Sequence, residues 1–124
     1  MNRNKDNSSL IFLRLRGILQ KHSGKFSVTS DRPDHYCLSL PWSPKFNKGF
    51  PIAWVKVSKS YVSYHFMPIY MLPKLMVNVP LGLKRRMQGK SCFNFKNFDE
   101  SLLNEIEHLT VKGFEECKKV GIVP

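Results

Sequence analysis

Residues 51–70, PIAWVKVSKSYVSYHFMPIY, contain the side chains that are best suited to bind a ligand. Polar and apolar residues alternate with a period of two, as expected for two β-strands joined at Lys59-Ser60, and this register places Trp54 opposite His65. A flat aromatic ring, a titratable imidazole, a cation and hydroxyl groups on one sheet face can stack a planar group and hold an anion. The residues predicted to bind a ligand are Trp54, Lys56, Tyr61, Ser63 and His65, with Lys90 further along the chain.

The opposite face of the same hairpin is apolar, and we expect it to pack against helices. A shift of one residue would mix the polar and apolar sets, so their clean separation supports the register. Lys59-Ser60 lacks the Asn or Gly that tight hairpin turns prefer, and a longer loop with a shifted register is the alternative. The polar face could also be covered by the loop 41–51 and serve only packing. The apolar set is Ala53, Val55, Val57, Val62, Tyr64 and Phe66.

A basic cluster, Lys84-Arg85-Arg86, lies on a helix expected from Pro80 to Gly89. Proline suits the first position of a helix, and glycine suits the position after its end. Adjacent cations can contact the phosphates of a nucleic acid, or they can form the solvated surface of a helix. Gly89-Lys90-Ser91 matches the last three residues of the phosphate-binding loop motif. The motif needs a glycine five residues before Gly89, and this position is Lys84. We therefore expect no nucleotide hydrolysis.

Catalysis by a nucleophile would need a cysteine or serine beside a base and a group that orients that base. His35 and Cys37 share one face of a predicted strand, and His65 lies on the polar face of the hairpin. An enzyme that uses His65 or Cys37 as base or nucleophile is therefore an alternative hypothesis, although no oxyanion-stabilising device is evident and no catalytic residue is assigned. The four histidines lack metal-ligand spacing, so we expect neither a metal nor a cofactor.

The net charge of +11 for 124 residues indicates an anionic partner or simply a soluble surface. Residues 1–98 carry 17 basic and 3 acidic side chains, whereas residues 99–124 carry 3 basic and 6 acidic ones. The basic surface is therefore expected to exclude the C-terminal segment. The length predicts a single domain, residues 1–124, with residues 1–7 frayed.

Three cysteines that lie far apart, Cys37, Cys92 and Cys117, fit neither a disulfide framework nor a zinc ribbon. We therefore expect reduced thiols and a cytoplasmic location. The apolar run Leu10–Leu13 is interrupted by Arg14, and no run of about 18 apolar residues occurs. These features predict neither a signal peptide nor a membrane partner.

The remaining chain predicts the elements that position these residues. A helix is expected over Leu10–Lys21, with a cap at Ser8 or Ser9 and an end at Gly24, and a second long helix is expected over residues 99–121. The expected class is α+β, a two-layer sandwich in which the N- and C-terminal helices pack on one face of a mainly antiparallel five-stranded sheet. An uncovered sheet face or edge strand would favour a homodimer. Besides the two hairpin strands, strands are expected at 26–29, 35–40 and 91–95.

From Pro51 to Cys117 the chain resembles small uncharacterised bacterial proteins in or beside the YdhG-like group of domains. The segments KSYVSYHFMPIY and LKRRMQGKSCFNFK carry this resemblance. It implies a compact α+β domain, since some YdhG-like relatives are compared with frataxin, an acidic iron chaperone. Iron chaperoning would use exposed carboxylates on the first helix, and Leu10–Lys21 has none. The resemblance therefore implies a fold and no functional residue.

The leading hypothesis from the sequence is a non-enzymatic binding module for a small anionic or planar ligand on the polar hairpin face. Lys56 and Lys90 would help to hold the anion. The first alternative is a nucleic-acid-binding protein that uses its basic surface, which requires an affinity that falls steeply with salt. The second alternative is the enzyme that uses His65 or Cys37.

Overall fold

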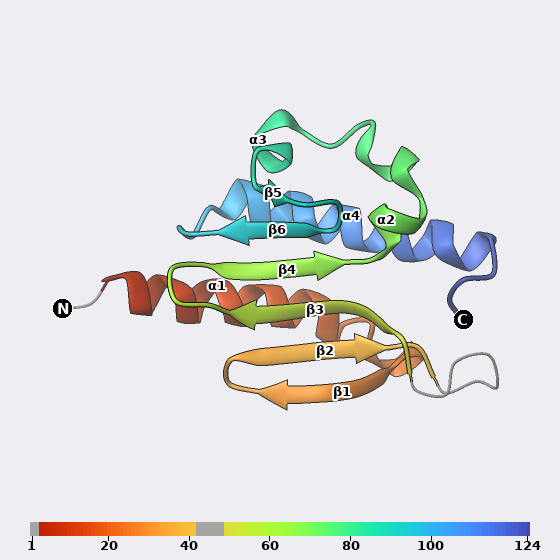
Figure 1. Ribbon diagram of the computed structural model, residues 1–124, viewed down its shortest axis with the longest axis horizontal. Helices are drawn as coiled ribbons and strands as arrows, with labels where there is room; N and C mark the ends of the chain where they lie inside the picture. The colour runs from red at the N-terminus through yellow and green to blue at the C-terminus, as the bar shows by residue number, and fades with distance from the viewer. Residues whose placement is uncertain (1–2, 42–48) are drawn as a thin grey trace.

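The computed structural model describes residues 3–41 and 49–124, with side chains from Asn7 onward. Its strands form one sheet in the order β1-β2-β3-β4-β6-β5, and every neighbouring pair is antiparallel (Figure 1). The predicted α+β class with an antiparallel sheet is confirmed, but the sheet has six strands rather than five. The strands are β1 (Ser27–Arg32), β2 (His35–Ser39), β3 (Pro51–Val57), β4 (Val62–Phe66), β5 (Met87–Gln88) and β6 (Cys92–Phe95).

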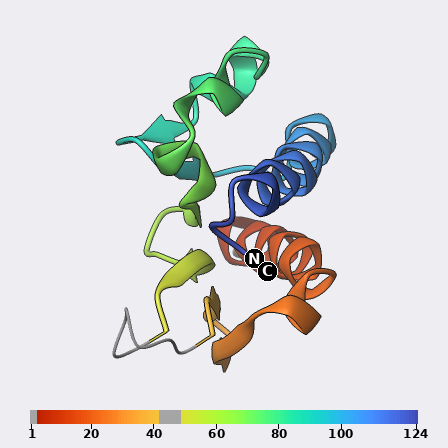
Figure 2. The ribbon, with the colours of Figure 1, turned by 90° about the vertical axis from the view of Figure 1, so that its right-hand side faces the viewer.

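Two long helices, α1 and α4, lie side by side on one face of the sheet (Figures 1 and 2). We call the opposite face, which is turned toward the viewer in Figure 1, the open face, because none of the described helices lies over it. In the described part of the chain, no helix has both the length and the apolar content that a membrane crossing requires. The helices are α1 (Arg3–Gln20), α2 (Pro68–Met71), α3 (Leu81–Lys84) and α4 (Glu100–Lys119), with 3-10 turns η1 (Ser23–Lys25) and η2 (Pro73–Met76).

The hairpin of β3 and β4 has the register that the alternation predicts. Trp54 pairs with His65, and the Ser58 N–H donates to the Tyr61 carbonyl at 2.8 Å, which leaves Lys59-Ser60 as the connection. Among the described residues only glycines have a positive φ, so this turn closes without the left-handed conformation of type I′ turns. The polar and apolar sets therefore lie on opposite faces of the sheet.

The core lies between the apolar hairpin face and the two helices. Ile11 and Leu15 of α1 and Leu103 of α4 are completely buried there. Gly113 allows α4 to approach β4 closely, because a Cβ atom at this position would lie 2.5 Å from the ring of Phe66. The interface between helix and sheet therefore depends on one missing side chain as well as on the apolar stripe.

The first helix begins earlier than expected. Residues 3–7, for which the sequence predicts fraying, are helical, so Ser8 and Ser9 lie inside α1 rather than at its cap. Gly24 lies in η1 without a positive φ, so the expected left-handed end at this glycine is wrong. Instead, the Ser23 hydroxyl donates to the Gln20 carbonyl at 2.9 Å and satisfies one acceptor of the last turn.

The predicted helix 80–89 is wrong in its second half. After the single turn of α3, Met87 enters β5 and pairs with Phe93 of β6, and Gly89 takes its φ of +77° in the turn between these strands. Leu83 is buried and Met87 packs against the core. A continuous helix would also bury both side chains, so their i, i+4 spacing does not distinguish it from a helical turn followed by a strand.

The ends of the last helix agree with the sequence. The Asp99 carboxylate accepts a hydrogen bond from the Leu102 N–H at 3.2 Å and caps α4, and Gly121 follows the helix with a φ of +79°. β1 continues to Arg32, three residues beyond its expected end, with an irregularity in its pairing after Val28. The hairpin of β1 and β2 is therefore longer than predicted.

Candidate functional site

The register of the sheet arranges the side chains of the open face in two rows that run across the strands. In the central row, Trp54 and His65 are flanked by Cys37 on β2 and Cys92 on β6. Alternate residues of each strand point to the same side, so the positions two residues away on each strand form a second row on the same face. This basic row contains Arg32, His35, Lys56, Ser63 and Asn94, with Arg86 before β5.

The rings of Trp54 and His65 form a parallel stack, with their centroids 4.5 Å apart and their planes at 10°. Both side chains are partly exposed. The stack occupies one face of each ring, so a planar ligand that extends it would have to contact the opposite face of one of the two rings. The predicted pairing of Trp54 with His65 is confirmed, whereas its role in ligand binding stays a prediction.

The imidazole of His65 lies in an environment that favours its neutral form. Burial of the ring, and then the charges of Lys56 and His35, lower the pKa of His65 below its usual 6.5. The Cys92 Sγ lies 3.5 Å from the His65 Nε2, and burial raises the pKa of the Cys92 thiol. Both directions favour a neutral imidazole and a protonated thiol near pH 7, whereas a reactive cysteine needs a thiolate.

His35 and Cys37, the pair that the sequence places on one strand face, have separate partners. The Nδ1 of His35 lies 2.7 Å from the Ser30 hydroxyl oxygen. The Cys37 thiol donates to the Leu38 carbonyl at 3.8 Å and lies 3.8 Å from the Ser39 hydroxyl oxygen. Cys37 is 6% exposed, so its sulfur lies below the surface with no hydrogen bond to a base among the described residues.

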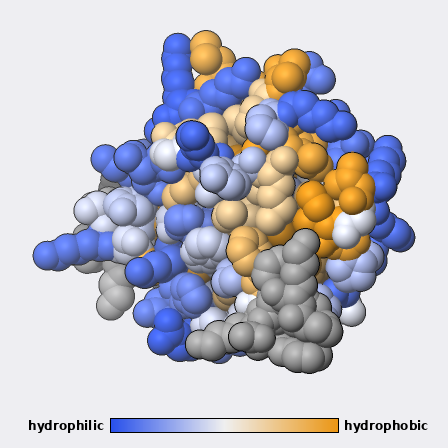
Figure 3. Space-filling model, turned by 45° about the vertical axis from the view of Figure 1, so that its right-hand side comes forward, coloured by the Kyte–Doolittle hydropathy of each residue, from blue (hydrophilic) through white to orange (hydrophobic). Residues whose placement is uncertain are grey.

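The basic row carries uncompensated positive charge. Lys56 and Arg86 are exposed, and neither forms an ion pair within residues 7–41 and 49–124. Arg32, at the other edge of the sheet, pairs with Asp34 at 3.8 Å. The glutamates all lie on α4, which is behind the sheet in Figure 1. Figure 3 shows the molecule obliquely, with hydrophilic side chains around an apolar area.

Three other predicted ligand residues differ in position and burial. Ser63 is 4% exposed and its hydroxyl donates to the Lys56 carbonyl at 3.4 Å, so it is not free to contact a ligand. Tyr61 is partly exposed beside the hairpin turn. Lys90 is exposed in the turn between β5 and β6, and the carbonyl of the next residue, Ser91, accepts a hydrogen bond from the N–H of Phe66 at the end of β4. Lys90 therefore lies at the opposite end of β4 from Lys56.

The basic patch of the sequence, Lys84-Arg85-Arg86, is exposed and lies at the end of α3 and just after it. The Asn94 N–H donates to the Arg86 carbonyl at 2.8 Å, which places Arg86 in the basic row, whereas Lys84 and Arg85 belong to the end of α3. Sequence reasoning missed the contact of Cys92 with His65. Alternation along the predicted strand 91–95 puts Cys92 and Asn94 on one face, but alternation alone does not identify the neighbouring strand.

Comparisons with family models, with curated proteins and with solved structures give no match to this chain. The resemblance to YdhG-like domains and the cytoplasmic location therefore stay predictions. The three cysteines are free and buried, and in the described ranges no three His, Cys, Asp or Glu side chains gather where they could hold a metal. The alternative in which the loop 41–51 covers the polar face falls mainly on residues 42–48, which lie outside the described residues.

Proposed function

We propose that the protein is a non-enzymatic binding module that holds a small planar anion on the open face of its sheet. The observation that carries this proposal is the exposed Lys56, which forms no ion pair within the described ranges and lies beside the stack of Trp54 and His65. Trp54 and Lys56 are two residues apart on β3, so their side chains leave the same face roughly 7 Å apart. This separation suits a ligand in which a phosphate or carboxylate adjoins an aromatic ring system, as in a nucleotide.

The charge of Lys56 would supply most of the affinity for the anion. Because Lys56 has no carboxylate partner among the described residues, a ligand would not have to displace one. A hydrogen bond to a charged group contributes about 1.5–3 kcal/mol, which corresponds to roughly tenfold or more in affinity. His65 would contribute its ring face and not a charge near pH 7, because burial lowers its pKa.

A second candidate function, binding of single-stranded nucleic acid, is favoured by the width of the basic row. Lys56 lies on β3 and Arg86 lies just before β5, with β4 and β6 between them. Three strand spacings separate the backbones at these two positions by roughly 14 Å, which suits an extended row of phosphates. A polyanion could contact both cations while its bases stack near Trp54 and Tyr61.

The two candidates can be separated by titration. Binding of adenosine monophosphate is measured by calorimetry, and binding of a labelled single-stranded oligothymidylate is measured by fluorescence anisotropy at low and high salt. We expect Lys56→Gln to weaken nucleotide binding roughly tenfold. The matched control is Lys112→Gln, an exposed lysine on α4 behind the sheet, which should leave the affinity unchanged.

The response of Arg86→Gln decides between the ligands. If the protein binds a small planar anion, this variant leaves nucleotide binding unchanged. If it binds nucleic acid, Arg86→Gln and Lys56→Gln both weaken oligothymidylate binding and reduce its dependence on salt. Both proposals are overturned if neither ligand binds, or if Lys56→Gln and Lys112→Gln have equal effects.

A further inference from the structure

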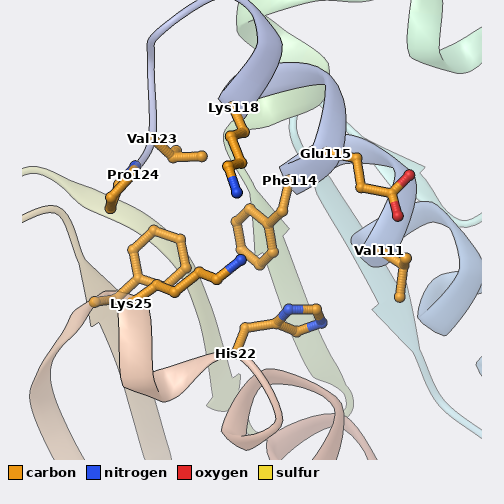
Figure 4. A pocket seen from close by; sticks show the side chains of 9 residues that line it. His22, Lys25, Val111, Phe114, Glu115, Lys118, Val123 and Pro124 are labelled. Carbon is orange, nitrogen blue, oxygen red and sulfur yellow. The ribbon is translucent and has the colours of Figure 1, made fainter.

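A cavity of about 330 Å³ lies between η1, the C-terminal half of α4 and the last residues of the chain (Figure 4). This volume is at the lower end of the range for small-molecule sites. Segments that are far apart in the sequence form the cavity, so no local pattern predicts it. Its lining includes His22, Lys25, Phe26, Phe114, Lys118 and Val123.

One wall of the cavity is aromatic and fixed in the core. The ring centroids of Phe26 and Phe114 lie 4.9 Å apart, and the His22 ring meets the Phe114 ring edge-on with a centroid distance of 5.0 Å. Phe114 is 7% exposed and packs against Phe66 at 5.2 Å, which anchors the wall. Burial, followed by the charges of two nearby lysines, lowers the pKa of His22 below its usual 6.5. The positive charge of the cavity near pH 7 therefore comes from its lysines and not from the imidazole.

Two lysines extend into this cavity from different elements. In Figure 4 the ammonium groups of Lys25 and Lys118 both point toward Phe114, while the Glu115 carboxylate points away from them. Neither lysine forms an ion pair within the described ranges, although the adjacent Lys119 pairs with Glu116 at 3.2 Å. Two lysines therefore border the apolar wall of the cavity, and neither has an ion-pair partner within the described ranges.

We propose that this cavity binds a small aromatic carboxylate, with the carboxylate between Lys25 and Lys118 and the ring against Phe26 and Phe114. A carboxylate between the two side chains would accept a charge-assisted hydrogen bond from each ammonium group. The aromatic wall favours an anion with an apolar body over a bare inorganic anion, because the apolar body leaves water on binding. This proposal shares no residue with the open face, so the two sites can succeed or fail separately.

The test is a titration of the ¹⁵N-labelled full chain with phenylacetate, followed by NMR. Phenylacetamide serves as the neutral comparator and inorganic phosphate as the purely anionic one. We expect phenylacetate to shift the amide signals of His22, Phe26 and Phe114 and to bind roughly tenfold more tightly than either comparator. Any purification tag belongs at the N-terminus, because Val123 and Pro124 line the cavity.

Charge variants test the role of each lysine. Lys25→Gln and Lys118→Gln should each weaken phenylacetate binding roughly tenfold, Lys25→Arg should keep most of the affinity, and Lys112→Gln on the same helix should change nothing. The lysines are exposed, and unchanged thermal melting would confirm that the variants fold. The proposal is overturned if either comparator binds as tightly as phenylacetate, if the shifts lie elsewhere, or if the double variant Lys25→Gln, Lys118→Gln keeps the wild-type affinity.

Discussion

A buried pair of hydroxyl groups joins the hairpin to α4, and the two partners should respond differently to removal. The Tyr64 Oη lies 2.6 Å from the Thr110 Oγ1, and both side chains are completely buried. The Thr110 hydroxyl donates its one proton to the Ile106 carbonyl at 2.8 Å, so Tyr64 is the donor to Thr110. Burial raises the pKa of Tyr64 well above its usual 10, which keeps this donor protonated at neutral pH.

The expected magnitudes follow from which group loses its partner. Thr110→Val should lower the free energy of unfolding by about 2 kcal/mol, because the Tyr64 hydroxyl stays buried without an acceptor. Tyr64→Phe should cost about 1 kcal/mol, because the Thr110 hydroxyl still donates to Ile106. The double variant should also cost about 1 kcal/mol, since it leaves no buried hydroxyl group unpaired. The coupling between the two positions is therefore about 2 kcal/mol.

The measurement is urea denaturation of the four proteins at pH 7, evaluated by linear extrapolation. Threonine and valine have similar helix propensities, and Val111→Thr on the exposed side of α4 controls for the remaining difference. The reasoning is refuted if the two single effects add within about 0.5 kcal/mol, which is the additivity expected for independent sites. It is also refuted if Tyr64→Phe costs more than Thr110→Val.

Three further predictions use the same denaturation assay. Gly113→Ala should destabilise the fold by about 1–3 kcal/mol, because its Cβ would lie 2.5 Å from the Phe66 ring. Gly17→Ala on α1 has open space around it and should stabilise the fold by about 0.5–1 kcal/mol. Equal effects of the two variants would contradict the packing argument. Because the pKa of His65 is lowered in the folded protein, its neutral ring contributes fully to the free energy of unfolding above pH 6.5, and this contribution is lost as the pH falls toward the folded-state pKa. His65→Gln should therefore flatten the loss of stability between about pH 7 and pH 5. An unchanged slope of stability against pH would count against this prediction. Lys21 and Arg14 lower the pKa of Glu107 below its usual 4.5. Glu107→Gln should therefore lower the free energy of unfolding by about 0.5–1 kcal/mol at pH 7 and by progressively less below pH 4.5. A loss of stability that does not shrink in acid would contradict the ion-pair origin.

The hairpin was predictable because its alternation separates two chemically different faces in only one register. Moving β4 by one residue would place Tyr64 on the polar face and His65 in the core, which burial of an imidazole opposes. The stack of Trp54 and His65 followed from the same register. Its hydrogen-bonded neighbour Cys92 did not, because the pairing of β4 with β6 spans the segment from Met67 to Ser91 and leaves no periodic signal.

The strand β5 and the cavity at the end of α4 could not be predicted from local sequence patterns. The strand β5 is two residues long, and its Met87 packs against the core as a residue of a continuous helix would. The cavity at the end of α4 combines residues 22–26 with residues 111–124, and only the packing of α4 beside α1 brings these segments together. Local propensity therefore identified the elements near the open face better than it identified the contacts between distant segments.

The ion pairs show which basic side chains behind the net charge of +11 have an acidic partner and which do not. On the helical side, Glu107 and Glu116 of α4 each contact two basic side chains, so much of the positive charge there is compensated. Lys56 on the open face has no such partner within the described ranges, and neither do Lys25 and Lys118 at the cavity. The expectation that the basic surface excludes residues 99–124 stays a prediction, and the proposed cavity site would use Lys118 of α4. Uncompensated cations beside aromatic rings, rather than the net charge, distinguish the two candidate anion sites from the remaining basic surface.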